Sequence, residues 1–284
     1  MLQAPKTLRP QDPPMIEIHN IKKSFNGVEI LKGIDCIFET GKTNLLLGGS
    51  GTGKSVLLQC IVGLQKPDSG SVTFDGKSFT NNKIEIRQEI RREIGMLFQG
   101  AALFDSMTVF ENTEFPLKML KPEMRPGERK DRVEEVLKRV GLDQAANKRP
   151  SEISGGMKKR AGVARAIAPN CKYLFCDEPN SGLDPLTSIK IDELIYEITQ
   201  EYNITTVVIT HDMNSVIEIG DHIIFLHQGR KLWDGAKEDI MRTPVKELNE
   251  FIFSNSLMRA ARRVEDEGGD LDDPIKGMER PAGK

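Results

Sequence analysis

Cysteine is scarce in this chain of 284 residues, and long apolar runs are missing from it. The four cysteines form no Cys-x-x-Cys pair and no zinc-like spacing, and three lie in apolar runs, which predicts buried thiols in a reducing, cytosolic compartment. No uninterrupted apolar stretch approaches the roughly 18 residues of a membrane-spanning helix. Basic and acidic residues nearly cancel, so the formal net charge of -2 gives no basic field to attract nucleic acid.

The two ends of the chain differ from its middle in composition. Residues 1–14 are polar, contain four prolines and have no apolar core of signal-peptide length, so we expect a flexible leader there. Residues 15–243 carry regular apolar patterns and predict one folded domain. The segment 244–284 begins with a short apolar stripe and ends in acidic and then Gly/Pro-rich sequence. We expect it to be a C-terminal extension whose last part is disordered.

Within the middle of the chain, short apolar strands alternate with helical patterns. This alternation predicts an α/β fold with a parallel sheet that is covered on both faces. The first two strands are joined by Asn26-Gly27, a strong hairpin signal. The expected strands are 15–25, 28–38, 43–47, 205–210 and a final hairpin of 222–226 and 230–233, and the clearest helical patterns are 133–140 and 191–198.

A glycine-rich loop follows the strand 43–47. The run Gly48-Gly49-Ser50-Gly51-Thr52-Gly53-Lys54-Ser55 fits the phosphate-binding pattern G-x-x-x-x-G-K-[ST] in full, and a helix that includes Val56 begins at its end. Glycines let backbone N–H groups turn inward around phosphates, and the helix directs its positive end at the same charges. Lys54 is expected to reach the β- and γ-phosphates, and the Ser55 hydroxyl to bind Mg²⁺. An ordinary glycine-rich turn is the alternative, but the strand–loop–helix context favours ATP or GTP binding.

Two acidic residues end a later apolar strand. Successive side chains of a strand point to opposite faces, so Asp177 and Glu178 share one site only if the strand ends between them. In enzymes with such a phosphate loop, the first acid holds Mg²⁺ through water and the second polarises the attacking water. A solvated strand end with two charges is the alternative, and it is the weaker one beside a phosphate loop.

A second candidate anion site lies between these motifs. Ser154 can cap the helix that follows, and Gly155 and Gly156 permit a close backbone approach. A helix start of this kind binds anions, but Lys54 already serves the phosphates of its own nucleotide. The segment is therefore expected to hold the nucleotide of another copy of the chain, with an ordinary helix start as the alternative.

Taken together, six motifs resemble those of the ABC transporter ATPases in order and spacing, from Met15 to about Thr243. The resemblance implies a P-loop NTPase with a RecA-like core, an antiparallel β-subdomain and a helical lobe at about 100–168. The motifs are the phosphate loop, Gln99 after Phe98, Ser154-Gly155-Gly156, Cys176-Asp177-Glu178-Pro179, Ser181-Gly182-Leu183-Asp184 and Thr210-His211-Asp212.

The resemblance also implies roles for individual residues. Phe25 matches the aromatic position that stacks on adenine, with a core phenylalanine as the alternative. Gln99 matches the glutamine that reaches Mg²⁺ and the attacking water, and Asp177 the acid that holds the metal through water. Glu178 matches the catalytic base, and His211 the histidine at the γ-phosphate.

In this family neither copy has a complete site, because Ser154, Gly155 and Gly156 contact the γ-phosphate bound by the other copy. ATP therefore joins two copies into a dimer, hydrolysis releases it, and membrane permease subunits convert the movement into transport. Asp184 matches the acid that links the two sites. One departure is Met157, which stands where the family usually has glutamine and cannot donate an amide's hydrogen bonds.

Met157 and the segment 98–117, rich in Phe, Leu, Met and acidic residues, are similar to the ATPases of Mla-type phospholipid transporters. That subtype implies an MCE-type lipid-binding protein in the assembled complex and a peripheral position on the cytoplasmic face of the bacterial inner membrane. An ATPase for a small-solute transporter is the first alternative. A soluble ABC ATPase acting on nucleic acid or ribosomes is the second, but the chain has one ATPase domain and no room for a long coiled-coil insertion.

Overall fold

Two β-sheets organise the first of the two units into which internal contacts divide the chain. The computed structural model describes residues 15–254; the first unit ends at Lys237, and the second begins at Glu238. The predicted leader and the part of the extension beyond residue 254 lie outside the described residues. Among the residues that are described, no helix has the length and apolar character to cross a membrane.

The smaller sheet is antiparallel. Its strands, in spatial order, are β2 (Val28–Phe38), β1 (Ile16–Phe25), β4 (Ser69–Phe74) and β5 (Lys77–Ser78). The predicted turn joins β1 to β2, with φ angles of 50° at Asn26 and 80° at Gly27, as a tight hairpin requires. In β1 the register shifts between Ile18 and Ile21, and Asn20 has a φ of 46°. This bulge explains why Ile18 and Ile21 are both buried although three positions separate them.

The larger sheet is parallel except for one edge strand. In spatial order its strands are β10 (Arg230–Gly235), β9 (His222–His227), β3 (Thr43–Leu47), β8 (Thr205–Thr210), β7 (Tyr173–Asp177) and β6 (Ile94–Leu97), with β10 antiparallel to β9. Every residue of β3 and β8 is buried, as expected for central strands covered on both faces. The carboxyl ends of β3, β6, β7 and β8 therefore meet at one edge of the sheet.

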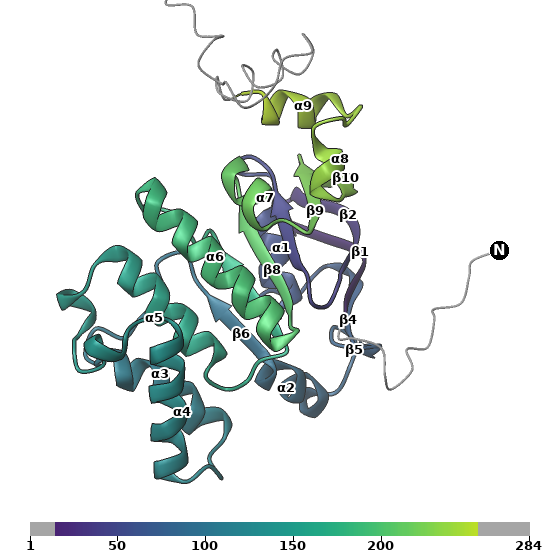
Figure 1. Cartoon of the computed structure of the whole chain (residues 1–284). Helices are drawn as coiled ribbons and strands as arrows, with labels where there is room; N and C mark the ends of the chain where they lie inside the picture. The colour runs from purple at the N-terminus through teal and green to yellow at the C-terminus, as the bar shows by residue number, and fades with distance from the viewer. Residues whose placement is uncertain (1–14, 255–284) are drawn as a thin grey trace, which may run out of the picture. The chain divides into compact units, whose positions relative to one another are not determined.

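Three of the helices form a group beside the larger sheet (Figure 1). The predicted periodicity is present on α4 (Pro126–Arg139), since Val133, Val136 and Leu137 are all buried. Contacts among α3, α4 and α5 make the helical group, which lies apart from the antiparallel sheet in Figure 1. The helices of the first unit are α1 (Lys54–Ile61), α2 (Ile84–Arg92), α3 (Val109–Leu120), α4 (Pro126–Arg139), α5 (Gly155–Ile167), α6 (Pro185–Tyr202) and α7 (Met213–Ile219), with 3₁₀ turns at Asp143–Ala145 and Pro150–Glu152.

One apolar core joins the two sheets. Leu57 of α1 packs in the same cluster as Leu46 and Phe175 of the parallel sheet and Phe38 and Phe74 of the antiparallel one. Phe175 is fully buried, so replacing it with alanine is expected to cost about 3–5 kcal/mol of stability. This shared core fixes the position of the antiparallel sheet beside α1 and the phosphate loop.

The predicted apolar stripe of the extension forms a short helix. A brief helix, α8 (Lys237–Ile240), spans the change between the two units, and α9 (Lys246–Ile252) lies in the second. The amide of Asn249 donates to the Thr243 carbonyl at 2.7 Å, which ties α9 to the turn before it. The unit boundary after Lys237 precedes the boundary at Thr243 that the sequence predicted.

Candidate functional site

The phosphate loop runs from the end of β3 to the start of α1, as the sequence predicts. Gly53 caps α1 with a φ of 102°, in the left-handed region that favours glycine. A Cβ added to Gly48 would lie 2.4 Å from the carbonyl oxygen of Leu226, so the loop passes against the end of β9. Val56 lies in the first turn of α1 and packs against the core, which holds the helix start beneath the loop.

Lys54 is folded over this loop. Its ammonium donates to the carbonyl oxygens of Gly48 at 2.7 Å and Gly49 at 2.8 Å, and the residue is only 5% exposed. Burial lowers the pKa of Lys54, and the nearby carboxylates of Glu178 and Asp177 oppose that shift. A buried cation, a glycine loop and a helix N-terminus together fit the chemistry of a triphosphate.

Asp177 is the last residue of β7 and lies beside the phosphate loop. It accepts a hydrogen bond from the Ser55 side chain. Burial raises the pKa of Asp177 and Glu178 acts in the same direction, while Lys54 and the hydrogen bond from Ser55 oppose the shift. A hydroxyl and a carboxylate are hard oxygen ligands of the kind Mg²⁺ prefers, and a dication there would favour the ionised carboxylate.

Glu178 is the first residue after the end of β7. Its φ of 45° turns the chain out of β7 directly after Asp177, which meets the condition for the two acids to serve one site. The Glu178 carboxylate accepts from the Gln99 amide at 3.2 Å and lies 3.3 Å from Nδ1 of His211. The Gln99 amide also donates to the Ser181 hydroxyl at 3.1 Å. Loops after three parallel strands thus place three predicted catalytic side chains in one hydrogen-bonded cluster.

A cavity of about 420 Å³ opens beside this cluster. Glu178, Ser181 and His211 line it together with Leu183 and Asn214. His211 follows β8 and its side chain is largely exposed, so the histidine and the carboxylate are both open to a ligand that enters from this side.

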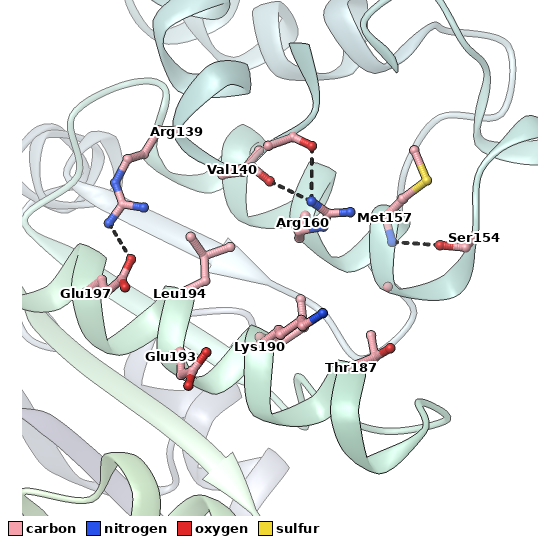
Figure 2. A pocket seen from close by; sticks show the side chains of 13 residues that line it. Arg139, Val140, Ser154, Met157, Arg160, Thr187, Lys190, Glu193, Leu194 and Glu197 are labelled. Atoms are coloured by element: carbon pink, nitrogen blue, oxygen red, sulfur yellow. Dashed lines mark hydrogen bonds and ion pairs between the residues drawn. The ribbon is translucent and has the colours of Figure 1, made fainter. Parts of the chain in front are cut away.

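The segment Ser154–Gly156 forms the start of α5. Ser154 caps α5, its hydroxyl accepting from the Met157 N–H at 3.3 Å, and both Ser154 and Gly155 are exposed. Gly156 packs against α6, where an added Cβ would lie 2.5 Å from a methyl group of Thr187. Figure 2 shows Ser154 and Met157 on the rim of a cavity of about 480 Å³ between α4, α5 and α6. Glu178 and His211 line a different cavity from Ser154.

Phe25 ends β1 and is 40% exposed, which does not fit the alternative of a core phenylalanine. The ammonium of Lys23 lies 5.1 Å from the centre of its ring. An exposed aromatic ring has a free face on which a flat base can stack.

Two buried charges in the site region were not among the predicted residues. Lys159 of α5 is 5% exposed, and its ammonium donates to the backbone carbonyls of Gln99 and, at 3.2 Å, Glu178. A signal exists in the sequence, because Lys159 falls on the buried stripe of α5 with Gly156 and Val163. The motifs gave Lys159 no role.

Asp192 of α6 is the other missed charge. Its carboxylate accepts from the amide of Asn180 at 2.7 Å and from the hydroxyl of Ser215 at 2.8 Å. Burial raises its pKa to about 6, against the lowering effect of these two hydrogen bonds. Asn180 lies two residues after Glu178, and Ser215 lies in α7, which begins two residues after His211. Asp192 therefore connects the segments that follow these two side chains.

Comparisons with known proteins show the family of the chain. The family model described as ABC transporter matches residues 31–181. The methionine import ATP-binding protein MetN of Carboxydothermus hydrogenoformans is 41% identical over 251 residues, which cover 86% of this chain and 74% of that protein. The probable ribonucleotide transport ATP-binding protein mkl of Mycobacterium tuberculosis is 36% identical over 237 residues, covering 84% and 66% respectively.

Solved structures share the fold. The dimeric structure of MJ0796, a bacterial ABC transporter cassette, matches with a TM-score of 0.72 and 33% identity, covering 78% of this chain and 98% of that one. A post-hydrolysis state of the same cassette, bound to ADP and Pi, matches with a TM-score of 0.72 and 32% identity over the same shares. The chain therefore belongs to the ABC transporter family, as an ATP-binding subunit that hydrolyses ATP with Mg²⁺.

Proposed function

We propose that two copies of this chain close around two ATP molecules and thereby drive a membrane permease. The observation that carries this proposal is that Ser154 and the cluster of Glu178 and His211 line different cavities of one chain. Ser154 and Gly155 are exposed at a helix start, which suits an anion that the same chain does not supply. A second copy supplies the missing triphosphate. The MJ0796 cassette, whose structure is dimeric, supports this arrangement.

The residues of the phosphate loop bind and orient ATP in this proposal. Lys54 holds the β- and γ-phosphates, and Phe25 stacks on the adenine. Ser55, Asp177 and Gln99 hold the Mg²⁺, which neutralises phosphate charge when it is bound.

Glu178 acts as the general base and accepts the proton of the attacking water. Gln99 and His211 hold its carboxylate from two sides in the structure, so the base is oriented before ATP arrives. His211 then contacts the γ-phosphate. Ser154, Gly155 and Gly156 of the second copy complete the site.

A groove on the helical group suits a permease. Phe98, Phe104 and Phe115 line a hollow of about 310 Å³ with Arg165, and the Phe104 and Phe115 rings lie 4.9 Å apart. Phe104 is exposed, and Phe98 and Phe115 are half-buried. Aromatic residues beside an arginine are typical of protein interfaces. The chain is thus proposed to sit peripherally on the cytoplasmic face of a bacterial inner membrane, through its permease.

The names of the relatives favour a small solute as the transported substance. They describe methionine import and ribonucleotide transport, so they support the small-solute alternative better than the phospholipid transport and MCE-type partner predicted from the sequence. We therefore infer small-solute transport first. Phospholipid transport stays a second candidate, on the similarity of Met157 and the segment 98–117 to Mla-type ATPases.

The two candidates differ in the permease that the chain binds. Mild detergent extraction of tagged chain from its own membranes, followed by mass spectrometry, is expected to recover a small-solute permease. Recovery of a permease with an MCE-type protein would instead favour the lipid candidate. Recovery of no membrane protein under conditions that preserve other transporters would contradict the proposed coupling to a permease.

A further inference from the structure

Lys159 makes unusual contacts for a helix lysine. It is almost fully buried, on the face of α5 that packs inward, although α5 begins at the exposed Ser154. Its ammonium donates to the backbone carbonyls of Gln99 and Glu178 rather than to a carboxylate. A buried ammonium is costly unless it is hydrogen-bonded. The two residues whose carbonyls satisfy it are those whose side chains meet in the catalytic cluster.

The backbone of Glu178 needs such support. Its φ of 45° lies in the left-handed region, which is unfavourable for a residue with a side chain. The Glu178 N–H donates to the Ile209 carbonyl at 3.0 Å, and the Glu178 carbonyl accepts from Lys159. Glu178 is thus held through both its backbone N–H and its carbonyl, and this backbone conformation directs its carboxylate toward Gln99 and His211.

The electrostatic surroundings agree with a fixed ammonium. Burial lowers the pKa of Lys159, while the Cys176 thiol, Glu178 and Asp177 act in the opposite direction. The Lys159 ammonium is bound to the carbonyls of Gln99 and Glu178, whereas the Lys54 ammonium is bound to the phosphate loop through Gly48.

We propose that Lys159 is a positioning residue for ATP hydrolysis, which holds the backbones of Gln99 and Glu178 so that the base is aligned. This inference rests on the proposed role of Glu178 as the base. Because α5 begins at Ser154, Lys159 also connects the segment that meets the second copy's ATP to the catalytic base of its own chain.

Lys159→Met tests the proposal, since methionine is of similar length and has neither charge nor N–H donor. We expect kcat for ATP to fall by about 10–100-fold, with KM changed by less than about twofold, because the ATP-binding groups stay in place. Lys159→Gln keeps one donor and is expected to retain an intermediate kcat. Arg132→Met is the matched control: Arg132 of α4 is a largely buried cation that donates to the backbone carbonyls of Ile167 and Ala168 at the far end of α5, at 3.2 Å each.

A readout specific to positioning comes from a double variant. If Lys159 acts through Glu178, adding Lys159→Met to Glu178→Gln should lower the residual single-turnover rate by less than about twofold. Equal losses in Lys159→Met and Arg132→Met, a rise in KM with kcat unchanged, or full additivity with Glu178→Gln would each overturn the proposal. Failure of both Lys159 variants to fold would assign the residue to folding instead. If Glu178→Gln itself keeps normal turnover, the proposed base is wrong, whereas an inactive Glu178→Gln beside a fully active Lys159→Met rejects the Lys159 inference alone.

Discussion

The catalytic edge of the sheet and the start of α5 are both expected to touch ATP, but they are built differently. At the sheet edge, Glu178 is held by Gln99, His211 and Lys159, and Lys54 is folded onto its loop. At the start of α5, the exposed Ser154 directs its hydroxyl to the first turn of the helix that it caps.

This difference teaches how a shared site can be divided. Residues that perform chemistry need fixed geometry, so the first region surrounds them with hydrogen bonds inside one chain. Residues that sense a second copy must stay open until it arrives, so the second region exposes a helix N-terminus. Variants that disturb only one region should therefore separate turnover from assembly.

The largest effect is expected from Glu178→Gln. The amide cannot accept a proton, so turnover should fall by about 10²–10⁴-fold while ATP binding persists. Size-exclusion chromatography with Mg-ATP should show a trapped dimer. Glu134→Gln, which removes only one partner of an exposed 3.7 Å ion pair on α4, should change turnover by less than about twofold. A Glu178→Gln chain that hydrolyses ATP normally would contradict the assigned base.

Lys54→Ala should primarily weaken the binding of ATP, the step that precedes hydrolysis. Loss of a charged hydrogen bond to phosphate costs about 1.5–3 kcal/mol, which corresponds to a Kd for ATP roughly 10–100-fold weaker. Fluorescence titration with a labelled ATP analogue measures this change. An unaltered Kd would show that the folded-back position of Lys54 persists when nucleotide binds, and that the loop backbone alone holds the phosphates.

Phe25→Ala is expected to have a smaller effect at the same site. Loss of stacking on adenine should weaken ATP binding by about 1 kcal/mol, roughly fivefold in Kd. Phe104→Ala removes a similarly exposed ring from the proposed permease groove and should leave the Kd for ATP unchanged. If both variants bind ATP as the native chain does, Phe25 does not contact the base.

Asp192→Asn is expected to change the free energy of unfolding rather than ATP binding, and the size of that change should depend on pH. Because the folded pKa of about 6 lies above the ordinary value of 3.8, the group favours the folded state fully below about pH 3.8, and this contribution is lost as pH rises through 6. At pH 7.5 the buried charge therefore costs stability, on the order of 1–3 kcal/mol. An asparagine side chain can also donate to Oδ1 of Asn180, which has no partner among the described residues.

Thermal unfolding measures this effect. Native chain should lose more stability than Asp192→Asn between pH 5.5 and 7.5, and the variant should be at least as stable at the higher pH. A parallel pH dependence of the two proteins would mean that Asp192 titrates normally. A variant that is less stable at pH 7.5 would show that the ionised carboxylate stabilises the two segments.

Much of the fold and of the catalytic cluster could be predicted from the sequence, because both depend on local patterns. The strand 43–47, the phosphate loop and the following helix are adjacent in the chain, so periodicity and spacing place them together. Glu178 and His211 follow predicted apolar strands, and the carboxyl ends of parallel strands meet at one edge. Gln99 was assigned by the family resemblance, because the strand before it, β6, was not predicted.

Other features depend on packing that no local pattern states. Lys159 and Asp192 are charged residues on helices, and charges on helices are usually solvated. Their burial follows from which face of α5 and α6 meets the catalytic loops. The bulge at Asn20 likewise follows from strand pairing with β2. The ATPase motifs are shared by many transporters and do not contact the transported substance. They therefore did not identify that substance.

A structure of the Glu178→Gln chain with Mg-ATP would test the division of the site between two copies most directly. We expect a dimer in which Ser154 of one copy lies within hydrogen-bond distance of a γ-phosphate oxygen of the ATP held by Lys54 of the other. A nucleotide enclosed by a single chain, with Ser154 remote from every phosphate, would contradict it.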